Sequence, residues 1–236
     1  MVDPELHVAG VASNGWIRVI PRMEKTAEPV VLVHGIWMTG VELLPLATRL
    51  RFAGFAPSIF RYASVRGNLD SSAGQLAAWL ARLDVPRCHI VAHSLGGLIA
   101  WRAVHHFIDP AQIGRVVALG TPFRAGRTAQ WLAARPATQW TLGRTMGPLV
   151  HHGTNCRWES RTEIGIIAGT RPYGIGRILG TLNGPNDGVV ALNETELPGG
   201  RAHIAIPTFH AGLLLSRQAS ALTARFLREG RFGEHP

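Results

Sequence analysis

Lysine and cysteine are nearly missing from this sequence. Lys25 is the single lysine, so arginine carries almost all of the basic charge behind the formal net charge of +9 at pH 7. The arginines are scattered and form no block, whereas nucleic-acid binding usually needs a clustered basic patch or stripe. Cys88 and Cys156 are the two cysteines, and Cys88 lies inside an apolar run. The composition therefore predicts neither a nucleic-acid partner nor a disulfide framework.

Long apolar runs are also missing. No stretch is long enough to span a bilayer, and the first residues, MVDPE, lack the basic-then-apolar pattern of a signal peptide. We therefore expect a cytoplasmic protein without stable membrane insertion, whose contact with a lipid surface is at most transient. His151 and His152 are adjacent with no third ligand nearby, and Gly174 and Gly176 lack the surroundings of a dinucleotide site. We expect no metal and no cofactor.

The pattern that is present is that of a globular α/β protein. Of the 236 residues, 46% are hydrophobic and 17% are charged, which suits one sizeable core. Short strand-like runs alternate with longer helix-like runs, which predicts a mostly parallel central sheet flanked by helices in a single domain over residues 1–236. The predicted strands cover residues 29–35, 56–61, 88–92, 114–120, 164–169 and 202–206. The predicted helices cover 41–55, 70–83 (with Asp70 or Ser71 as N-cap), 95–107 and 211–228.

The regular alternation lapses between Thr121 and Glu163. An ordinary connection in an α/β unit has ~2–6 residues, so we expect a small helical cap insertion over residues 123–160. Ligands bind at the carboxyl ends of strands in open α/β sheets, which places such an insertion beside the binding site. The candidate pocket residues are Trp37, Met38, Phe123, Trp131, Trp140 and Met146. For Trp37, Met38 and Phe123, packing in the hydrophobic core is an equally good explanation.

A candidate nucleophile lies in the segment VAHSLGG, residues 91–97. A strand runs into Ser94 and a helix leaves directly after it, so the turn lifts the hydroxyl above the sheet. Small residues are needed two positions before and two after the serine, because the strand and helix backbones nearly touch there. Ala92 and Gly96 meet that need, although the usual residue at position 92 is glycine. The pattern predicts that Ser94 is a nucleophile.

Two backbone N–H groups are suited to stabilise an oxyanion beside Ser94. The first strand ends in His34-Gly35-Ile36, and Gly35 lets the chain bend close to a substrate. Acyl transfer builds up negative charge on an oxygen, which two N–H donors stabilise. The N–H groups of Ile36 and Leu95 are the predicted donors, and we expect His34 to be structural.

Five segments together resemble a known family. They are VVLVHGIW (30–37), VAHSLGG (91–97), LGTPF (119–123), GPNDGVV (184–190) and FHAGLL (209–214). In this order they are similar to the motifs of bacterial esterases and lipases of the α/β-hydrolase superfamily, over about residues 30–214. The resemblance implies the α/β-hydrolase fold, ester hydrolysis and the triad order serine, acid, histidine. Alanine at position 92 looks like the variant of small bacterial lipases, and the first strands of larger members are expected to be missing or reduced over residues 1–28.

The acid of the triad must then lie between Ser94 and the histidine in sequence. Asp187 occupies a turn between the last two predicted strands, which is the right edge of the sheet. Asp109 ends the helix that leaves the site and is therefore badly placed. Glu194 and Glu196 are the reserves. We predict Asp187 as the acid, although its surroundings also fit plain turn chemistry.

Three histidines follow Asp187 in the sequence. His203 lies in the last predicted strand and His235 in the tail, whereas His210 lies just past that strand, where a loop can bring an imidazole over the serine. We predict that His210 takes the Ser94 proton and that Asp187 fixes its tautomer.

The sequence thus predicts a carboxylester hydrolase that forms an acyl-enzyme and acts on a small-molecule ester or lipid. Because the insertion is small, we expect short-to-medium acyl esters to be preferred. The same triad also suits a thioesterase, an acyltransferase or an amidase. A further alternative is a ligand-binding protein of the same fold without turnover.

Overall fold

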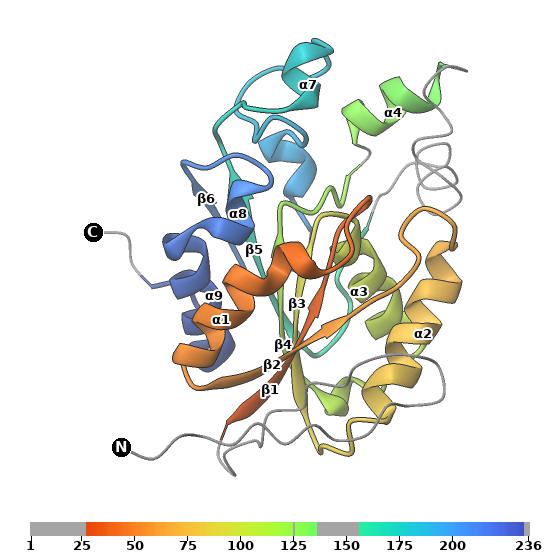
Figure 1. Cartoon of the computed structure of the whole chain (residues 1–236), viewed down its shortest axis with the longest axis vertical. Helices are drawn as coiled ribbons and strands as arrows, with labels where there is room; N and C mark the ends of the chain where they lie inside the picture. Colours follow the sequence, from red (N-terminus) through yellow and green to blue (C-terminus); the bar gives the residue numbers. More distant parts are fainter. Residues whose placement is uncertain (1–26, 125, 136–155, 234–236) are drawn as a thin grey trace.

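Six strands form one parallel sheet in the order β2-β1-β3-β4-β5-β6 (Figure 1). The structure, a computed structural model, describes residues 27–124, 126–135 and 156–233. The strands are β1 (Glu28–Val33), β2 (Phe55–Phe60), β3 (Cys88–His93), β4 (Ile113–Leu119), β5 (Glu163–Gly169) and β6 (Ala202–Ile206). Each begins and ends within two residues of its predicted range, and the predicted fold class is confirmed.

Helices cover both faces of the sheet. The α-helices of the described residues are α1 (Leu44–Phe52), α2 (Leu69–Ala81), α3 (Leu95–His106), α4 (Arg127–Ala133), α7 (Ile175–Ile178), α8 (Gly212–Leu215) and α9 (Arg217–Glu229). The described residues also form three short 3-10 helices, which are η1 (Val41–Leu43), η2 (Pro110–Gln112) and η4 (Leu192–Thr195). One face of the sheet packs against α1, α8 and α9, and the other packs against α2 and α3 (Figure 1).

Side chains of successive strand residues enter two separate cores, because they alternate between the faces of a sheet. In β3, Ile90 and Ala92 face the helices α2 and α3, whereas Val91 faces α1 and α9. β3 is buried along its whole length, as expected for a central parallel strand covered on both sides. The end of this strand, where Ser94 follows, is therefore held rigidly.

Two helix boundaries differ from the prediction. The last helix, expected over residues 211–228, is divided into α8 and α9 at Ser216, whose backbone is extended (φ −71°, ψ 125°). The Ser216 side chain accepts a hydrogen bond from the Ala219 N–H at 3.1 Å and so starts a new helix. The N-cap of α2 is Asn68, which accepts from the Ser71 N–H at 2.7 Å, and is neither Asp70 nor Ser71.

The strand order reverses between β1 and β3. From β1 the chain goes outward to β2, then returns to the other side of β1 to form β3, and continues outward through β4, β5 and β6. A crevice outside the carboxyl ends of two such strands is the usual ligand site of an open α/β sheet. The loop after β1 and the turn after β3 meet at this point.

The segment expected as a cap, residues 123–160, lies partly outside the described residues, namely at 125 and 136–155. Of its described part, α4 lies beyond the carboxyl ends of the strands (Figure 1). The two ends of the segment come together, since the Cys156 N–H donates to the Phe123 carbonyl at 3.3 Å. Thr128 in α4 also donates to the Val189 carbonyl at 2.8 Å, which ties this helix to the turn that carries Asp187.

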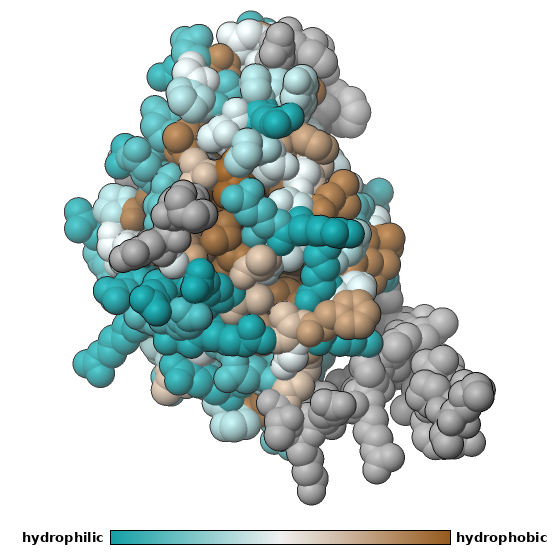
Figure 2. Space-filling model, turned by 90° about the vertical axis from the view of Figure 1, so that its left-hand side faces the viewer, coloured by the Kyte–Doolittle hydropathy of each residue, from teal (hydrophilic) through white to brown (hydrophobic). Residues whose placement is uncertain are grey.

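Within the described ranges, no helix combines the length and apolarity that crossing a bilayer requires. Figure 2 shows the side of the molecule formed around α8, α9 and β6. Strongly hydrophilic residues gather in the lower half of this view, and hydrophobic residues show mainly above them, toward the carboxyl ends of the strands.

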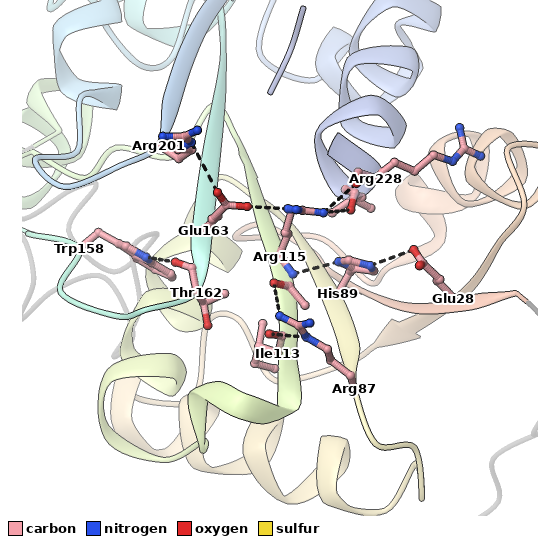
Figure 3. Close-up of polar contacts among 12 residues, drawn as sticks. Glu28, Arg87, His89, Ile113, Arg115, Trp158, Thr162, Glu163, Arg201 and Arg228 are labelled. Atoms are coloured by element: carbon pink, nitrogen blue, oxygen red, sulfur yellow. Dashed lines mark hydrogen bonds and ion pairs between the residues drawn. The ribbon is translucent and has the colours of Figure 1, made fainter. Parts of the chain in front are cut away.

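Polar side chains join the amino ends of the strands into one network (Figure 3). In β3, His89 donates from Nε2 to Glu28 at 3.2 Å, and its Nδ1 accepts from the Arg115 N–H at 2.9 Å. The Arg115 side chain pairs with Glu163 at 2.7 Å and donates to two carbonyls at the end of α9 at 2.9 Å each. This network at the amino ends of the strands, called the amino edge below, therefore joins β1, β3, β4, β5 and α9.

Candidate active site

Ser94 lies between β3 and α3 with a strained backbone (φ 54°, ψ −123°). A non-glycine residue keeps such a conformation only where its surroundings enforce it. Here the Ser94 N–H donates to the Leu119 carbonyl at 2.9 Å, and the Ser94 carbonyl accepts from the Gly97 N–H at 2.9 Å and from the Thr121 hydroxyl at 3.1 Å. Neighbouring strand and helix thus hold the turn from both sides.

Small residues around Ser94 allow α3 to touch the end of β1. A Cβ atom on Gly96 would lie 2.5 Å from the Val33 carbonyl oxygen and 2.6 Å from that of His34, so only glycine fits. Ala92 is fully buried next to Val33 in the register of β1 and β3. The spacing seen in the sequence reflects this contact between backbones.

The loop after β1 approaches the serine. A Cβ atom on Gly35 would lie 3.1 Å from the Ser94 Cβ. Neither the Ile36 N–H nor the Leu95 N–H donates a hydrogen bond within the described part of the chain, and Leu95 is the first residue of α3. The amino end of a helix carries partial positive charge, which favours an anion there. Trp37, in the left-handed region at φ 59°, is 52% exposed.

Asp187 and His210 form a tightly held pair. Asp187 is 1% exposed, and its Oδ2 accepts a hydrogen bond from His210 Nδ1 at 2.7 Å. Its Oδ1 accepts from the N–H groups of Val189 at 3.0 Å and Val190 at 2.8 Å. The backbones are joined as well, because the His210 N–H donates to the Asp187 carbonyl at 2.9 Å. The carboxylate therefore has a fixed orientation toward the ring.

The His210 ring lies over the carboxyl end of β4. A Cβ atom on Gly120 would lie 3.1 Å from His210 Cε1 and Nδ1, so glycine makes room for the ring. The ring centroid is 4.7 Å from that of His93, the residue directly before Ser94. In this structure Ser94 and His210 share no direct hydrogen bond, and no described residue occupies His210 Nε2.

His34 is part of the supporting structure. Its ring is fully buried, stacks on Tyr62 with centroids 4.4 Å apart, and donates from Nδ1 to the Gly35 carbonyl at 2.9 Å. The Tyr62 hydroxyl donates to the His34 carbonyl at 2.8 Å. Burial lowers the pKa of His34, so the ring is neutral and holds the loop that carries Ile36.

The other acids and histidines considered from the sequence face elsewhere. Glu194 is buried, and its carboxylate accepts from the N–H groups of Arg127 at 2.7 Å and Ala191 at 2.9 Å. Burial raises the pKa of this carboxyl. Three further alternatives also have other partners: Glu196 pairs with Arg124, Asp109 caps η2, and His203 shares a hydrogen bond with the Thr195 hydroxyl. The last alternative, His235, lies outside the described residues.

The candidate pocket residues have different environments. Phe123 is fully buried in the core against α3, Met38 packs on the core of the other face, and Trp131 is stacked under the Arg135 guanidinium. Trp140 and Met146 lie outside the described residues. Two surface hollows, of about 380 and 330 Å³, lie beside β6 and at the amino ends of β3 and β4, and no predicted site residue lines them.

Comparison with known proteins shows the family of the chain. Residues 30–227 match the alpha/beta hydrolase family. The chain therefore belongs to the alpha/beta hydrolase family. A comparison with curated protein sequences returned no match.

Solved structures of esterases and lipases share the fold at low sequence identity. The propeptide form of Bacillus licheniformis lipase BlEst2 is 18% identical with a TM-score of 0.74, and the match covers 92% of this chain but only 54% of that one. Its mature form is 18% identical with a TM-score of 0.66, covering 89% of this chain and 94% of that one. The metagenomic carboxyl esterase MGS0156 is 16% identical with a TM-score of 0.67, covering 97% and 84%.

Proposed function

We propose that this protein is a carboxylester hydrolase with Ser94, Asp187 and His210 as its catalytic triad. The observation that carries the proposal is a strained serine at the start of α3, with a buried Asp187–His210 pair at the same edge of the sheet. An ordinary turn needs neither the strain nor the buried pair. Family membership and structural neighbours described as lipase and carboxyl esterase also support the proposal.

In the proposed reaction, the Ser94 hydroxyl attacks the ester carbonyl carbon while His210 Nε2 takes its proton. Asp187 keeps the proton on His210 Nδ1 and stabilises the imidazolium that forms. The N–H groups of Ile36 and Leu95 bind the oxyanion. The imidazolium then gives its proton to the leaving alcohol, and an activated water releases the acid from the acyl-enzyme.

Exposed apolar side chains near this edge favour an apolar substrate. Several large hydrophobic residues are at least partly solvent-exposed on the segments that follow the carboxyl ends of β1, β5 and β6. They are Trp37, Val41, Leu44, Tyr173, Ile175, Phe209 and Leu215. Apolar side chains exposed on the segments beside a site can contribute to substrate binding. Together with the small size of the segment between β4 and β5, they favour a small ester with a short-to-medium acyl chain as the substrate.

Labelling by a fluorophosphonate probe tests the chemistry directly. The wild-type protein should react and hydrolyse p-nitrophenyl butyrate, whereas Ser94→Ala should do neither while keeping its circular dichroism spectrum. A Ser94→Ala variant with wild-type turnover would contradict the assignment. An unreactive, inactive wild-type protein would favour a ligand-binding role instead.

A substrate series tests the specificity. Each buried methylene contributes ~0.8 kcal/mol, so two methylenes can raise kcat/KM about tenfold until the binding region ends. Across p-nitrophenyl esters from acetate to palmitate we expect a maximum at short-to-medium length, and a steady rise through palmitate would refute this preference. In the same panel, an anilide substrate reveals an amidase and an acyl-CoA substrate reveals a thioesterase. An acyl-CoA substrate with an added alcohol acceptor reveals an acyltransferase, because the acyl group then appears on the alcohol and not as the free acid.

A further inference from the structure

His93, for which the sequence predicts no role, contacts the predicted base. It is the last residue of β3, directly before Ser94, and is 1% exposed. Its Nε2 lies 3.2 Å from the carbonyl oxygen of His210. A carbonyl can only accept, so Nε2 carries the proton and donates it. No described residue pairs with its Nδ1, which is also buried.

The His93 ring is an uncharged donor. Burial, and then the neighbouring His210, lower the pKa of His93 well below its usual range. A neutral ring suits this place, because a second cation beside His210 would oppose the imidazolium that forms in the proposed reaction. The contact therefore supplies a hydrogen bond without an opposing charge.

Four hydrogen bonds hold His210, and their partners differ. In two of them His210 donates to Asp187, from its N–H to the backbone carbonyl at 2.9 Å and from Nδ1 to the carboxylate at 2.7 Å. In the third the His210 carbonyl accepts from the Leu213 N–H at 3.3 Å, within the turn that leads into α8. The fourth comes from His93, which donates to the same carbonyl. The hydrogen bonds to Asp187 alone would fix His210 only relative to the turn that carries Asp187. His93 connects the base to β3, the strand that carries the nucleophile.

The same ring also meets the loop that carries a predicted oxyanion donor. A Cβ atom on Gly35 would lie 3.2 Å from His93 Nδ1, so the loop after β1 packs directly against the imidazole. The buried His93 side chain thus contacts two loops, the one before Ile36 and the one around His210. His93 is also the residue directly before Ser94 in the chain.

We propose that His93 is a positioning residue that sets the placement of His210 over Ser94 through its hydrogen bond to the His210 carbonyl. This inference rests on the proposed function, since it assigns a role relative to the triad. His93 touches neither substrate nor reacting atoms in this role. Its loss should lower kcat more than it changes KM, because substrate binding does not use it.

Two substitutions separate the hydrogen bond from the packing. His93→Gln keeps an N–H donor at the far end of the side chain, whereas His93→Leu fills a similar space without one. A misplaced catalytic group lowers the rate about 100-fold per ångström, so we expect kcat of His93→Leu to fall about 10- to 100-fold. The glutamine variant should keep most of the activity. Hydrolysis of p-nitrophenyl butyrate measures both.

A matched control lies on the same strand. His89 is also buried in β3 and also has its pKa lowered by burial, but it belongs to the amino edge of the sheet. His89→Leu should lower the melting temperature and leave kcat unchanged. A general effect of losing a buried histidine would instead lower kcat in both leucine variants.

Proton NMR measures a signal that a loss of stability alone does not change. The His210 Nδ1 proton, bonded to Asp187, should give a sharp downfield signal that His93→Leu broadens or shifts and His93→Gln retains. An unchanged signal together with wild-type kcat in a folded His93→Leu protein would overturn the proposal. If the leucine variant does not fold, His93→Asn replaces it, because its amide is one methylene too short for the carbonyl. Equal kcat for the asparagine and glutamine variants would then overturn the proposal.

Failure of the proposed function can be distinguished from failure of the role proposed for His93. If Ser94→Ala keeps its turnover, the triad itself is wrong. If Ser94→Ala is inactive while His93→Leu has wild-type kcat and KM, the triad stands and only the role of His93 is rejected.

Discussion

Two histidine–carboxylate pairs lie at opposite ends of the parallel strands and differ in the burial of the carboxylate and in the partners of the imidazole. At the carboxyl edge, Asp187 is 1% exposed in its side chain and lies 2.7 Å from His210. At the amino edge, Glu28 is 59% exposed in its side chain and lies 3.2 Å from His89 (Figure 3). The first carboxylate also accepts two backbone N–H groups, which fix its orientation.

The difference that matters for chemistry is whether the second nitrogen of the imidazole ring has a hydrogen-bond partner. In His89 both nitrogens are occupied, one by Glu28 and one by the Arg115 N–H, so the ring joins strands and has no lone pair for a substrate. In His210 no described residue takes Nε2. A histidine–carboxylate pair alone is therefore weak support for catalysis, whereas a buried acid, an unoccupied nitrogen and a nearby serine together are strong support.

Removing the acid of each pair should show the largest contrast. Asp187→Asn keeps the shape but allows the wrong tautomer of His210, and the comparable change in serine proteases lowers kcat about 10⁴-fold. We expect a loss of about 10³- to 10⁴-fold in p-nitrophenyl butyrate hydrolysis. A kcat close to that of the wild type would remove Asp187 from the triad and bring Glu194 back into consideration.

Breaking the amino edge should affect stability and leave activity unchanged. Arg115→Ala leaves two carbonyls at the end of α9 without their donor and removes one ion pair of Glu163. Losing one partly buried hydrogen bond to a carbonyl and one partly buried ion pair should together cost about 1–3 kcal/mol of unfolding free energy, while water can replace the donor at the exposed carbonyl. Urea denaturation should show that loss, with kcat per folded molecule unchanged. A large fall in kcat would mean that the two edges are coupled.

Acidification should weaken the fold through its buried histidines. The pKa of His89 is lowered by burial from its usual value of 6.5, so the unfolded chain takes up a proton that the folded protein does not. Stability should therefore fall as the pH drops below about 6.5, by up to about 1.4 kcal/mol per pH unit for one such group. His89→Gln should flatten the dependence of melting temperature on pH between 7.5 and 5. Parallel curves for variant and wild type would show that His89 does not contribute.

The smallest effect should come from Glu28. Its carboxylate is more than half exposed, and among the described residues it pairs with His89. Exposed ion pairs contribute about 0–1 kcal/mol, so Glu28→Gln should change the unfolding free energy within that range and leave kcat unchanged. A loss as large as that of Arg115→Ala would show that His89 needs this partner to stay in place.

The strands and the serine turn could be predicted from the sequence because their signals are local. Short β-branched runs mark the strands, and Ala92, Ser94 and Gly96 have the spacing that a close strand–helix contact demands. The helix N-caps were harder, since several polar residues precede α2 and the chain uses Asn68. The helical spacing of apolar residues continues through α8 and α9, so this pattern does not reveal the break at Ser216.

Long-range contacts had no such signal. His93 and the His210 carbonyl are far apart in sequence, and a side chain that bonds a distant backbone group requires no particular residue there. The burial of Glu194 was equally hidden, because its partners are backbone N–H groups of Arg127 and Ala191. Any residue except proline can supply those donors.

The double link between Asp187 and His210 has a consequence for how the protein opens. The chain between these residues contains η4 and β6, and among the described strands β6 lies at the edge of the sheet and pairs only with β5. Edge elements are common sites of partial unfolding below the global transition. When β6 detaches, Asp187 and His210 lose their support together while the rest of the sheet persists. We therefore expect amide hydrogen exchange in β6 to accelerate, and heat inactivation to set in, at temperatures where the core strands β1, β3 and β4 are still protected.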